Sequence, residues 1–416
     1  MASLNHVNMG KRDNWVPIQE GPSFQPRKLK VVCIGAGFAG LMLSYQHKHG
    51  DASLENFMDL RIYEKNDNIR GTWLVNTYPG VACDVPAHIY TFPFEPNPSW
   101  SQFYASGPEI WTYIKKTSDN GRLEIQQAHS RDIVQEEADI VINATGFLSK
   151  WNWPKIVGLD KFKGKLVHTA AWDTSLDWSD KRVAIIGNGS SAPALDQWRV
   201  RLRVHTEGKN FTYTDEEIQS FKDDEDMFFQ LRHSIEHSMN KFFRVSIKDS
   251  PEQQHAFREF KAKMEDALNH DPDLCARLIP TFQVGCRRLN PGENYLEALQ
   301  QESVTLQDEP IQEIFEGGIR SLTKTEEFDI IVCATGFDVS FVPGYEVLGQ
   351  NGISLAKQWK DTPEAYFGVF AANMPNFFII NGPNTLLAHG SLLAVMSFTV
   401  DYISRWIRKI STQNIK

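Results

Sequence analysis

The stretch KLKVVCIGAGFAGLMLSYQHKHG, residues 28–50, decides the fold of this chain. It begins with an apolar run, continues through a glycine-rich turn, and ends with an apolar helical pattern that stops at Gly50. This order predicts a buried strand, a tight turn and a helix, which together open a βαβ unit. In such a unit Gly35 permits the turn, Gly37 lets a pyrophosphate approach the backbone, and Gly40 lets helix and strand pack closely.

The acidic residue Glu64 ends the next apolar segment, DLRIYEK (residues 59–65). An acid at about this distance from the glycine turn accepts hydrogen bonds from the hydroxyl groups of a ribose. The helix N-terminus after the turn attracts the diphosphate. We therefore predict that this unit binds a dinucleotide, either a flavin or a nicotinamide dinucleotide. The loop residues predicted to contact it are Gly35, Ala36, Gly37, Phe38, Ala39 and Gly40.

A second glycine turn lies in KRVAIIGNGSSAPALDQ, residues 181–197. Its predicted contact residues are Gly187, Asn188, Gly189, Ser190, Ser191 and Ala192, with alanine in place of the third glycine. Two such turns suit the transfer of a hydride from a nicotinamide to a flavin. The alternative is a helix-capping turn of glycine and serine, which Pro193 inside the first helical turns would favour.

Two further segments, ADIVINATGF (residues 138–147) and FDIIVCATGF (residues 328–337), are near copies. Each runs an apolar strand into Ala-Thr-Gly, which indicates an internal duplication. Because the second glycine turn lies between the copies, we expect one nucleotide-binding unit to be nested inside the other. The resulting fold class is α/β, with two Rossmann-like dinucleotide-binding domains.

Residues 214–280 are rich in charge and predict a helical insertion. Thr214 with Glu217, and Ser250 with Gln253, form the start signals of capped helices. Four apolar residues then recur every four positions, as one buried helix face requires: Met227, Leu231, Ile235 and Met239.

The composition of the chain limits its partners. A formal net charge of −9 provides no basic surface for nucleic acid. The five cysteines are scattered and form no CxxC pair, so we expect neither a disulfide framework nor a metal site. No apolar stretch approaches the roughly 18 residues that a transmembrane segment needs. We therefore expect a cytoplasmic protein whose partners are small molecules or another protein.

Aromatic residues and an acid mark the segment RGTWLVNTYPGVACDVPAHIYTF, residues 70–92. Aromatic faces suit stacking on a flat ring system, and Asp84 among them would be partly desolvated. Arg287 and Arg288, in GCRRLNPGENYLEAL (residues 285–299), offer fixed positive charge for a negative intermediate. The alternatives are a surface loop that carries core aromatics and a solvated pair of arginines. The pattern does not choose between the two arginines.

Between the two glycine turns lies FKGKLVHTAAWD, residues 162–173. Five of its residues match the pattern FxGxxxHxxxW followed by P or D, namely Phe162, Gly164, His168, Trp172 and Asp173. This complete match resembles the fingerprint of the type I Baeyer–Villiger monooxygenases. The glycine turns, the tract GTW…YPG..CD (residues 71–84) and both Ala-Thr-Gly strands are also similar to that family. The resemblance covers nearly all of residues 29–411.

The resemblance implies two cofactors and a reaction. FAD would occupy the first glycine turn and NADPH the second. The implied reaction inserts one atom of O2 next to the carbonyl of a ketone and gives an ester or a lactone. The chain looks most like fungal members of the family, many of which serve secondary-metabolite pathways, and this suggests a polyketide-type substrate.

The resemblance also implies roles for individual residues. FAD would be contacted by Thr72, Trp73, Leu74, Cys83, Asp84 and Tyr90. Asp84 would pair with Arg288, which matches the catalytic arginine of the family and would stabilise the negative intermediate. His168 would take part in coupling the two cofactors.

The predicted parts of the chain follow from this assignment. They are an N-terminal extension (1–28), the first part of the FAD-binding domain (29–160), a fingerprint linker (161–180), an NADPH-binding domain with the helical insertion (181–330, insertion 214–280), and an apparently truncated C-terminal part of the FAD-binding domain (331–416).

Internal departures from the family pattern predict a shortened chain. Only a short charged tract separates Ile114 from Ala138, where relatives place a small β-meander. After Ala192 the expected helix and strand are compressed, so the residues left to hold the 2′-phosphate of NADPH are Arg199, Arg201 and Arg203. Two other hypotheses stay open: an N- or S-oxygenating flavin monooxygenase, and an inactive flavin-binding remnant.

Overall fold

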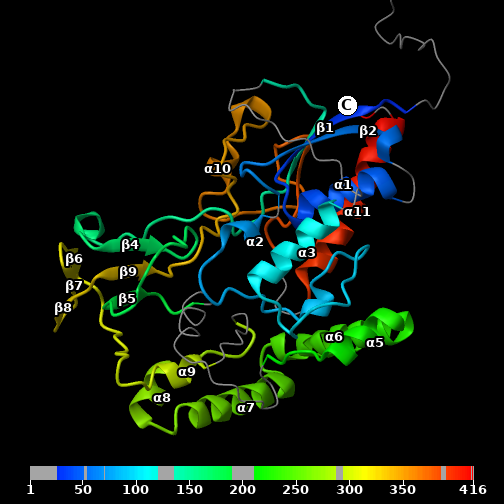
Figure 1. The fold of residues 1–416 in the computed structure, drawn as a ribbon. Helices are drawn as coiled ribbons and strands as arrows, with labels where there is room; N and C mark the ends of the chain where they lie inside the picture. The colour runs from blue at the N-terminus through cyan, green and yellow to red at the C-terminus, as the bar shows by residue number, and fades with distance from the viewer. Residues whose placement is uncertain are drawn as a thin grey trace, which may run out of the picture.

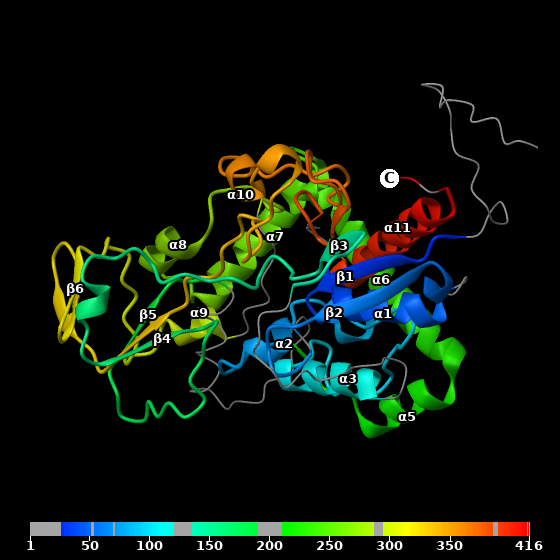
Figure 2. The ribbon, with the colours of Figure 1, turned by 90° about the horizontal axis from the view of Figure 1, so that it is seen from above.

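The structure, a computed structural model, describes residues 26–50, 54–69, 71–119, 135–189, 210–286, 294–385, 390–413 and 415. Their strands form two parallel sheets and one antiparallel sheet. Figures 1 and 2 show the two parallel sheets on opposite sides of the molecule.

The first sheet is parallel and has the strand order β10-β3-β1-β2. Its strands are β1 (Leu29–Ile34), β2 (Met58–Tyr63), β3 (Ile140–Asn143) and β10 (Phe377–Ile379). β10 comes from far along the chain and pairs with β3, with Phe377 opposite Val141. The strand, turn and helix predicted for residues 28–50 are confirmed as β1 and α1 (Phe38–His49).

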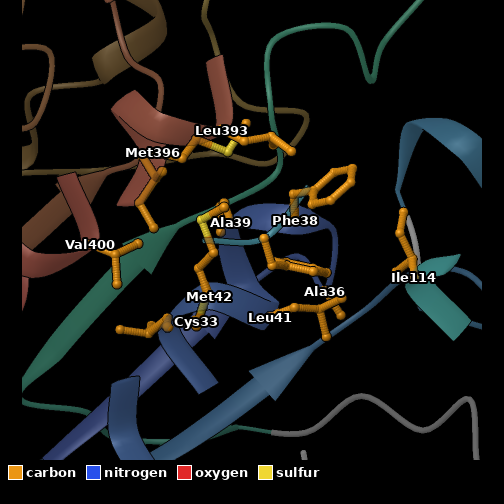
Figure 3. Packing of buried hydrophobic residues seen from close by; sticks show 14 of the residues in the cluster. Cys33, Ala36, Phe38, Ala39, Leu41, Met42, Ile114, Leu393, Met396 and Val400 are labelled. Atoms are coloured by element: carbon orange, nitrogen blue, oxygen red, sulfur yellow. The ribbon is translucent and has the colours of Figure 1, made fainter. Parts of the chain in front are cut away.

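Helix α11 (Leu392–Gln413) packs with α1 to form the main core. One face of α11 is buried, as residues such as Leu393, Met396 and Val400 show, whereas Phe398 is 74% exposed. Figure 3 shows these three buried residues beside Ala39 and Met42 of α1. α11 is therefore amphipathic, and only its inner face is buried.

The second sheet is also parallel, with the order β4-β9-β5. Its strands are β4 (Lys165–His168), β5 (Val183–Ile186) and β9 (Ile330–Cys333), and every residue of the central strand β9 is buried. β4 is part of the fingerprint, so the fingerprint contributes a strand to this sheet. All three strands lie between β3 and β10 in the sequence, so the second unit is nested in the first and the α/β fold class is confirmed.

The antiparallel sheet is formed by β6 (Glu313–Phe315), β7 (Gly318–Arg320) and β8 (Thr325–Glu327). It lies directly before β9, the strand that leads into the second Ala-Thr-Gly copy. The corresponding tract of the first copy, residues 120–134, and the compressed tract after the second glycine turn, residues 190–209, lie outside the described residues.

The predicted insertion contains α5 (Asp215–Asp223), α6 (Glu225–Lys241), α7 (Pro251–Ala267) and α8 (Pro272–Leu278). The capping box at the start of α5 is confirmed, and the hydroxyl of Ser250 caps α7. On α6 the predicted face is partly wrong. Leu231, Ile235 and Met239 pack against other apolar residues, but Met227 is 45% exposed and Phe228 is buried in its place.

The remaining helices are short, apart from α3 (Gly107–Asp119). They are α2 (Thr72–Val75), α9 (Tyr295–Ala298), α10 (Leu355–Gln358), and the 3₁₀ turns η1 (Leu54–Asn56), η2 (Ala87–Ile89), η3 (Leu159–Lys161), η4 (Phe242–Ser246) and η5 (Gln350–Gly352). Among the helices that the structure describes, none combines the length and apolarity needed to cross a bilayer.

Candidate functional site

The first glycine turn is built from backbone alone. Gly35 has a φ of +110°, and a β-carbon there would lie 2.6 Å from the carbonyl oxygen of Ala144. A β-carbon on Gly40 would lie 2.1 Å from the carbonyl oxygen of Gly35. Both positions exclude a side chain, so strand, turn and helix close tightly in the way the sequence predicts.

Gly37 faces another glycine across the turn. A β-carbon on Gly71 would lie 3.2 Å from Cα of Gly37, and Gly71 has a φ of +52°. The two glycines keep side chains away from the place where α1 begins. A backbone cradle of this kind fits the diphosphate of a dinucleotide, which can approach the helix N-terminus without meeting a side chain.

Glu64 lies directly after β2 and reaches back to the same turn. One carboxylate oxygen accepts a hydrogen bond from the N–H of Ala36 at 2.9 Å. The other accepts from the backbone N–H and the side-chain amide of Asn66, at 3.0 and 2.7 Å. The carboxylate is therefore held beside the glycine turn, where a ribose of the dinucleotide would present its hydroxyls.

The predicted aromatic contacts gather over this turn. The Trp73 ring is buried, and its Nε1 donates a hydrogen bond to the hydroxyl of Tyr90 at 3.3 Å. The ring centroid of Phe38 lies 5.4 Å from that of Tyr90. Thr72 and Leu74 belong to α2, which begins immediately after Gly71. The structure thus brings these residues to one place, and their contact with a cofactor stays a prediction.

Cys83 and Asp84 lie on the segment after α2. Cys83 is buried, and its N–H donates to the carbonyl oxygen of Ala105 at 3.0 Å. Asp84 is half-buried, as we expect for a functional acid. Arg287 and Arg288 lie outside the described residues, so the pairing of Asp84 with Arg288 stays a prediction.

The second glycine turn repeats the geometry of the first. Gly187 has a φ of +108°, and a β-carbon there would lie 2.5 Å from the carbonyl oxygen of Ala334. Ala334 belongs to the second Ala-Thr-Gly motif, so each glycine turn is closed by its own copy of that motif. Asn188 and Gly189 are exposed. The other predicted contacts, Ser190, Ser191 and Ala192, lie outside the described residues.

His168 of the fingerprint reaches the second Ala-Thr-Gly motif. The residue ends β4 and is 1% exposed, and its Nδ1 accepts a hydrogen bond from the N–H of Ala170 at 3.1 Å. The proton of the neutral ring is therefore on Nε2, which donates to Oγ1 of Thr335 at 3.1 Å. Burial lowers the pKa of His168, so the ring is neutral at neutral pH. Since Thr335 follows Ala334, one hydrogen bond joins the fingerprint to the turn at Gly187.

Gly164, Phe162 and Asp173 fix the backbone of the fingerprint. A β-carbon on Gly164 would lie 2.5 Å from the carbonyl oxygen of Asp329 and 2.6 Å from the Phe162 ring. Only glycine therefore lets β4 start so close to β9. Asp173 accepts a hydrogen bond from Nζ of Lys165 at 2.7 Å. That bond and those from Ser175 lower the pKa of Asp173 to about 2.

Trp172 of the fingerprint belongs to an apolar cluster on the second sheet. It packs with Tyr78 against Ile330 and Val332 of β9. Tyr78 also packs against the main core of the first sheet. The fingerprint and the tract after the first glycine turn therefore share one apolar contact.

Known proteins resemble this chain over most of its length. A family model described as an NAD(P)-binding Rossmann-like domain matches residues 33–106. The FAD-binding monooxygenase tazF of Aspergillus terreus is 42% identical over an alignment of 439 residues, which covers 95% of this chain and 78% of that protein. A Baeyer-Villiger monooxygenase of Pseudomonas aeruginosa is 30% identical, with 91% of this chain and 76% of that protein covered. The chain belongs to the type I Baeyer–Villiger monooxygenase family.

A solved structure agrees with this assignment at the level of the fold. The crystal structure of OTEMO in complex with FAD and NADP matches with a TM-score of 0.75 and 21% identity, over 94% of this chain and 87% of that one. The alignment with tazF is longer than the 416 residues of this family member, so tazF carries residues that it lacks. The predicted family and the predicted class of enzyme are confirmed.

Three residues near the site of this Baeyer–Villiger monooxygenase family member escape the sequence analysis: Thr335, Asn143 and Tyr345. Asn143 and Thr335 lie in or beside the two Ala-Thr-Gly copies, so the duplication itself was a usable signal. Tyr345 carries no local signal, because its hydroxyl donates to Oδ1 of Asn143 across a separation of 202 residues.

Proposed function

We propose that this protein is a Baeyer–Villiger monooxygenase that uses FAD and NADPH to convert a ketone into an ester or a lactone. The overall reaction consumes the ketone, O2, NADPH and a proton, and it releases the ester or lactone, NADP⁺ and water. FAD and NADP(H) are the cofactors of the family to which the chain belongs. Because the chain resembles fungal members of the family, and tazF comes from a fungus, we also propose a role in fungal secondary metabolism. The polyketide-type ketone proposed as substrate rests on the family resemblance alone.

One observation carries this proposal. The fingerprint is complete in sequence, and His168 donates to Thr335 beside the second glycine turn. A hydride transfer between two nucleotides needs their two sites held in a fixed relation, because small displacements of reacting groups slow the reaction strongly. The fingerprint contacts both units, because His168 binds Thr335 beside the second glycine turn and Trp172 shares an apolar cluster with Tyr78, which follows the first glycine turn.

The residues of the first glycine turn fit FAD. Gly35, Gly37 and Gly71 leave a cradle free of side chains for the diphosphate, and Glu64 lies beside it for a ribose. When bound, FAD accepts a hydride from NADPH and activates O2 for transfer to the substrate carbonyl. Trp73 and its neighbours shield this place from water, which strengthens electrostatic interactions inside it.

Asp84 and Arg288 are the proposed catalytic residues. A guanidinium holds its charge at every accessible pH and offers fixed donors, so Arg288 would stabilise the negative charge that develops on oxygen. The half-buried carboxylate of Asp84 would orient that guanidinium. The 2′-phosphate of NADPH would be held by one of Arg199, Arg201 and Arg203.

A flavin-binding remnant is the alternative that a specific observation favours. β5 is an edge strand of the second sheet in the described residues, and its Ile185 is 39% exposed. The turn after it, residues 187–189, is exposed as well. A protein of this kind would bind FAD and would not be reduced by NADPH.

The deciding experiment is anaerobic addition of NADPH to the purified protein while the flavin absorbance is followed. Bleaching supports the proposal, and bound flavin that stays oxidised contradicts it and favours the remnant. Air is then admitted with a ketone, an amine or a sulfide, and the products are identified with ¹⁸O2. An ester that carries one labelled atom supports the proposed reaction, whereas label only in an N- or S-oxide supports the other class of monooxygenase.

Arginine variants test the catalytic assignment. We expect Arg288→Ala to keep reduction by NADPH and to lose ester formation by a factor of at least about 100, as loss of a group that stabilises an oxyanion does. Arg287→Ala is the matched control. Ester formation that survives in Arg288→Ala and vanishes in Arg287→Ala would move the role to the neighbouring arginine.

The location of the protein is also a proposal. The thiols of Cys33, Cys275, Cys286 and Cys333 form no disulfide, and Cys286 is exposed. Exposed thiols persist in compartments kept reducing by glutathione and thioredoxin. We therefore place the protein in the cytoplasm.

A further inference from the structure

Residues 335–345 return the chain from the second sheet to the first, and we refer to them as the return linker. The linker begins at Thr335, directly after β9, and ends at Tyr345, whose side chain reaches β3. Each end thus lies at one of the two Ala-Thr-Gly motifs. These motifs close the two glycine turns, through Ala144 at Gly35 and through Ala334 at Gly187.

One side of the linker is open. Residues 335–340 wall a cavity of about 620 Å³ together with Trp359 and Lys360. Backbone that borders such a space lacks the apolar packing that fixes a buried strand. The position of the linker therefore depends on the contacts at its ends and along its other side.

The outgoing chain, residues 147–150, provides the contacts along the middle of the linker. The N–H of Asp338 donates to the carbonyl oxygen of Lys150 at 2.7 Å, and Nζ of Lys150 lies 3.1 Å from the Asp338 carboxylate. The rings of Phe147 and Phe341 lie with centroids 6.0 Å apart. The return linker and residues 147–150, the two segments that run between the parallel sheets, are thus bound to each other.

Tyr345 anchors the far end of the linker. Its hydroxyl donates to Oδ1 of Asn143 at 3.0 Å, and the same oxygen accepts from Oγ1 of Thr145 at 2.9 Å. Asn143 is buried, so this oxygen needs donors from the protein. Burial raises the pKa of Tyr345, which keeps the phenol protonated and able to donate throughout the usable pH range.

Loss of the Tyr345 hydroxyl would leave Oδ1 of Asn143 with the hydroxyl and the N–H of Thr145 as its donors. It would also remove the hydrogen bond that ties the end of the linker to β3. The neighbouring carbonyl of Ala144 and the N–H of Thr145 lie 2.6 and 3.1 Å from where a β-carbon of Gly35 would be. A shift of this motif therefore displaces the glycine turn that holds the dinucleotide. At the other end, the hydrogen bond from His168 to Thr335 ties the linker to the fingerprint.

We infer that Tyr345 is a positioning residue of this enzyme. Its hydroxyl orients Asn143 and so holds the first Ala-Thr-Gly motif in place under the FAD site. The return linker connects that motif to the NADPH site. The inference rests on the proposed function. It assigns the coupling of the two nucleotide sites to two hydrogen bonds, one at each end of the linker.

The test compares Tyr345→Phe with wild type in two measurements. The first is the dissociation constant of FAD, obtained by titrating the apoprotein and following flavin fluorescence. The second is the rate constant of flavin reduction by NADPH in anaerobic stopped flow. We expect weaker FAD binding and slower reduction, each by about three- to tenfold, the ratio that one neutral hydrogen bond supplies. Tyr366→Phe, at a tyrosine that is 67% exposed, is the matched control and should equal wild type.

Asn143→Ala distinguishes positioning from a general loss of packing. If Tyr345 acts through Asn143, the phenylalanine substitution should have little further effect on FAD binding in the Asn143→Ala background. Equal FAD affinity and equal reduction rate in wild type and Tyr345→Phe would overturn the inference. If wild-type flavin is not reduced by NADPH, the proposed function fails, and the FAD titrations alone decide the role of Tyr345.

Discussion

Replacing His88 with leucine should make the protein more resistant to acid. His88 is fully buried where η2 meets the helical insertion, with its ring edge-on to Tyr213, Phe221 and Phe228 at centroid distances of 4.8, 5.5 and 5.6 Å. Within the described residues, neither ring nitrogen has a hydrogen-bond partner. This apolar enclosure accepts a neutral imidazole and disfavours a charged one.

The size of the effect follows from the pKa of His88. Burial, with a smaller contribution from the charge of Arg232, lowers this pKa from 6.5 to about 4. The unfolded chain therefore binds a proton between these two pH values that the folded chain does not bind. Since the unfolded state holds more protons, the free energy of unfolding falls as the pH falls through this window. The lowered pKa of His88 corresponds to a loss of about 3 kcal/mol in the free energy of unfolding once the pH has fallen from above both pKa values to below both.

Urea unfolding followed by tryptophan fluorescence measures this effect. Between about pH 7 and about pH 5, His88 should account for a loss of about 2 kcal/mol in the wild type. His88→Leu should lack this loss, and at neutral pH it should be more stable by about 1 to 3 kcal/mol because no buried nitrogen is left unsatisfied. His255→Leu, at an exposed position on α7, is the control. An acid-induced loss in His88→Leu as large as that in wild type would refute the reasoning.

Three further substitutions test the site and the core. Gly35→Ala should weaken FAD binding by about thirtyfold, because the left-handed backbone costs a side chain about 2 kcal/mol. Gly317→Ala, in the turn between β6 and β7 where a β-carbon would meet only side-chain atoms, should bind FAD normally in the same titration. Thr335→Val removes the acceptor of His168 and should slow reduction by NADPH by up to about tenfold in stopped flow, and an unchanged rate would remove the fingerprint contact from the mechanism. Ile403→Ala in the buried face of α11 should lower the free energy of unfolding in urea by about 2 to 5 kcal/mol, and a change below about 1 kcal/mol would show that this core site collapses without a cavity.

The sequence predicts those parts of the fold that depend on short-range patterns. The strand, turn and helix at residues 28–50, the acid at Glu64 and the capping box at Thr214 all rest on residues within one turn or one βαβ unit. Such patterns have local physical causes, a required φ angle or an unsatisfied N–H group, and these causes are readable without the rest of the chain.

Long-range partners were not predictable in this way. His168 meets Thr335 across 167 residues, and Tyr345 meets Asn143 across 202. No periodicity or spacing rule connects residues so far apart, because the sheets that bring them together must form first. Met227 illustrates the opposite error, since a regular spacing of four suggested burial, but the insertion packs with the neighbouring Phe228 inward.

The strand order of the first sheet has a consequence for folding during synthesis on the ribosome. β3 is covered on one edge by β10, and α1 is covered by α11, and both of these partners follow much later in the sequence. At a synthesis rate of about 5 to 20 residues per second, α1 waits roughly 20 to 70 seconds for its partner. During that interval the nested unit can assemble, while the first glycine turn remains attached to an unfinished core with exposed apolar surface. The nascent chain should therefore depend on chaperones until α11 emerges.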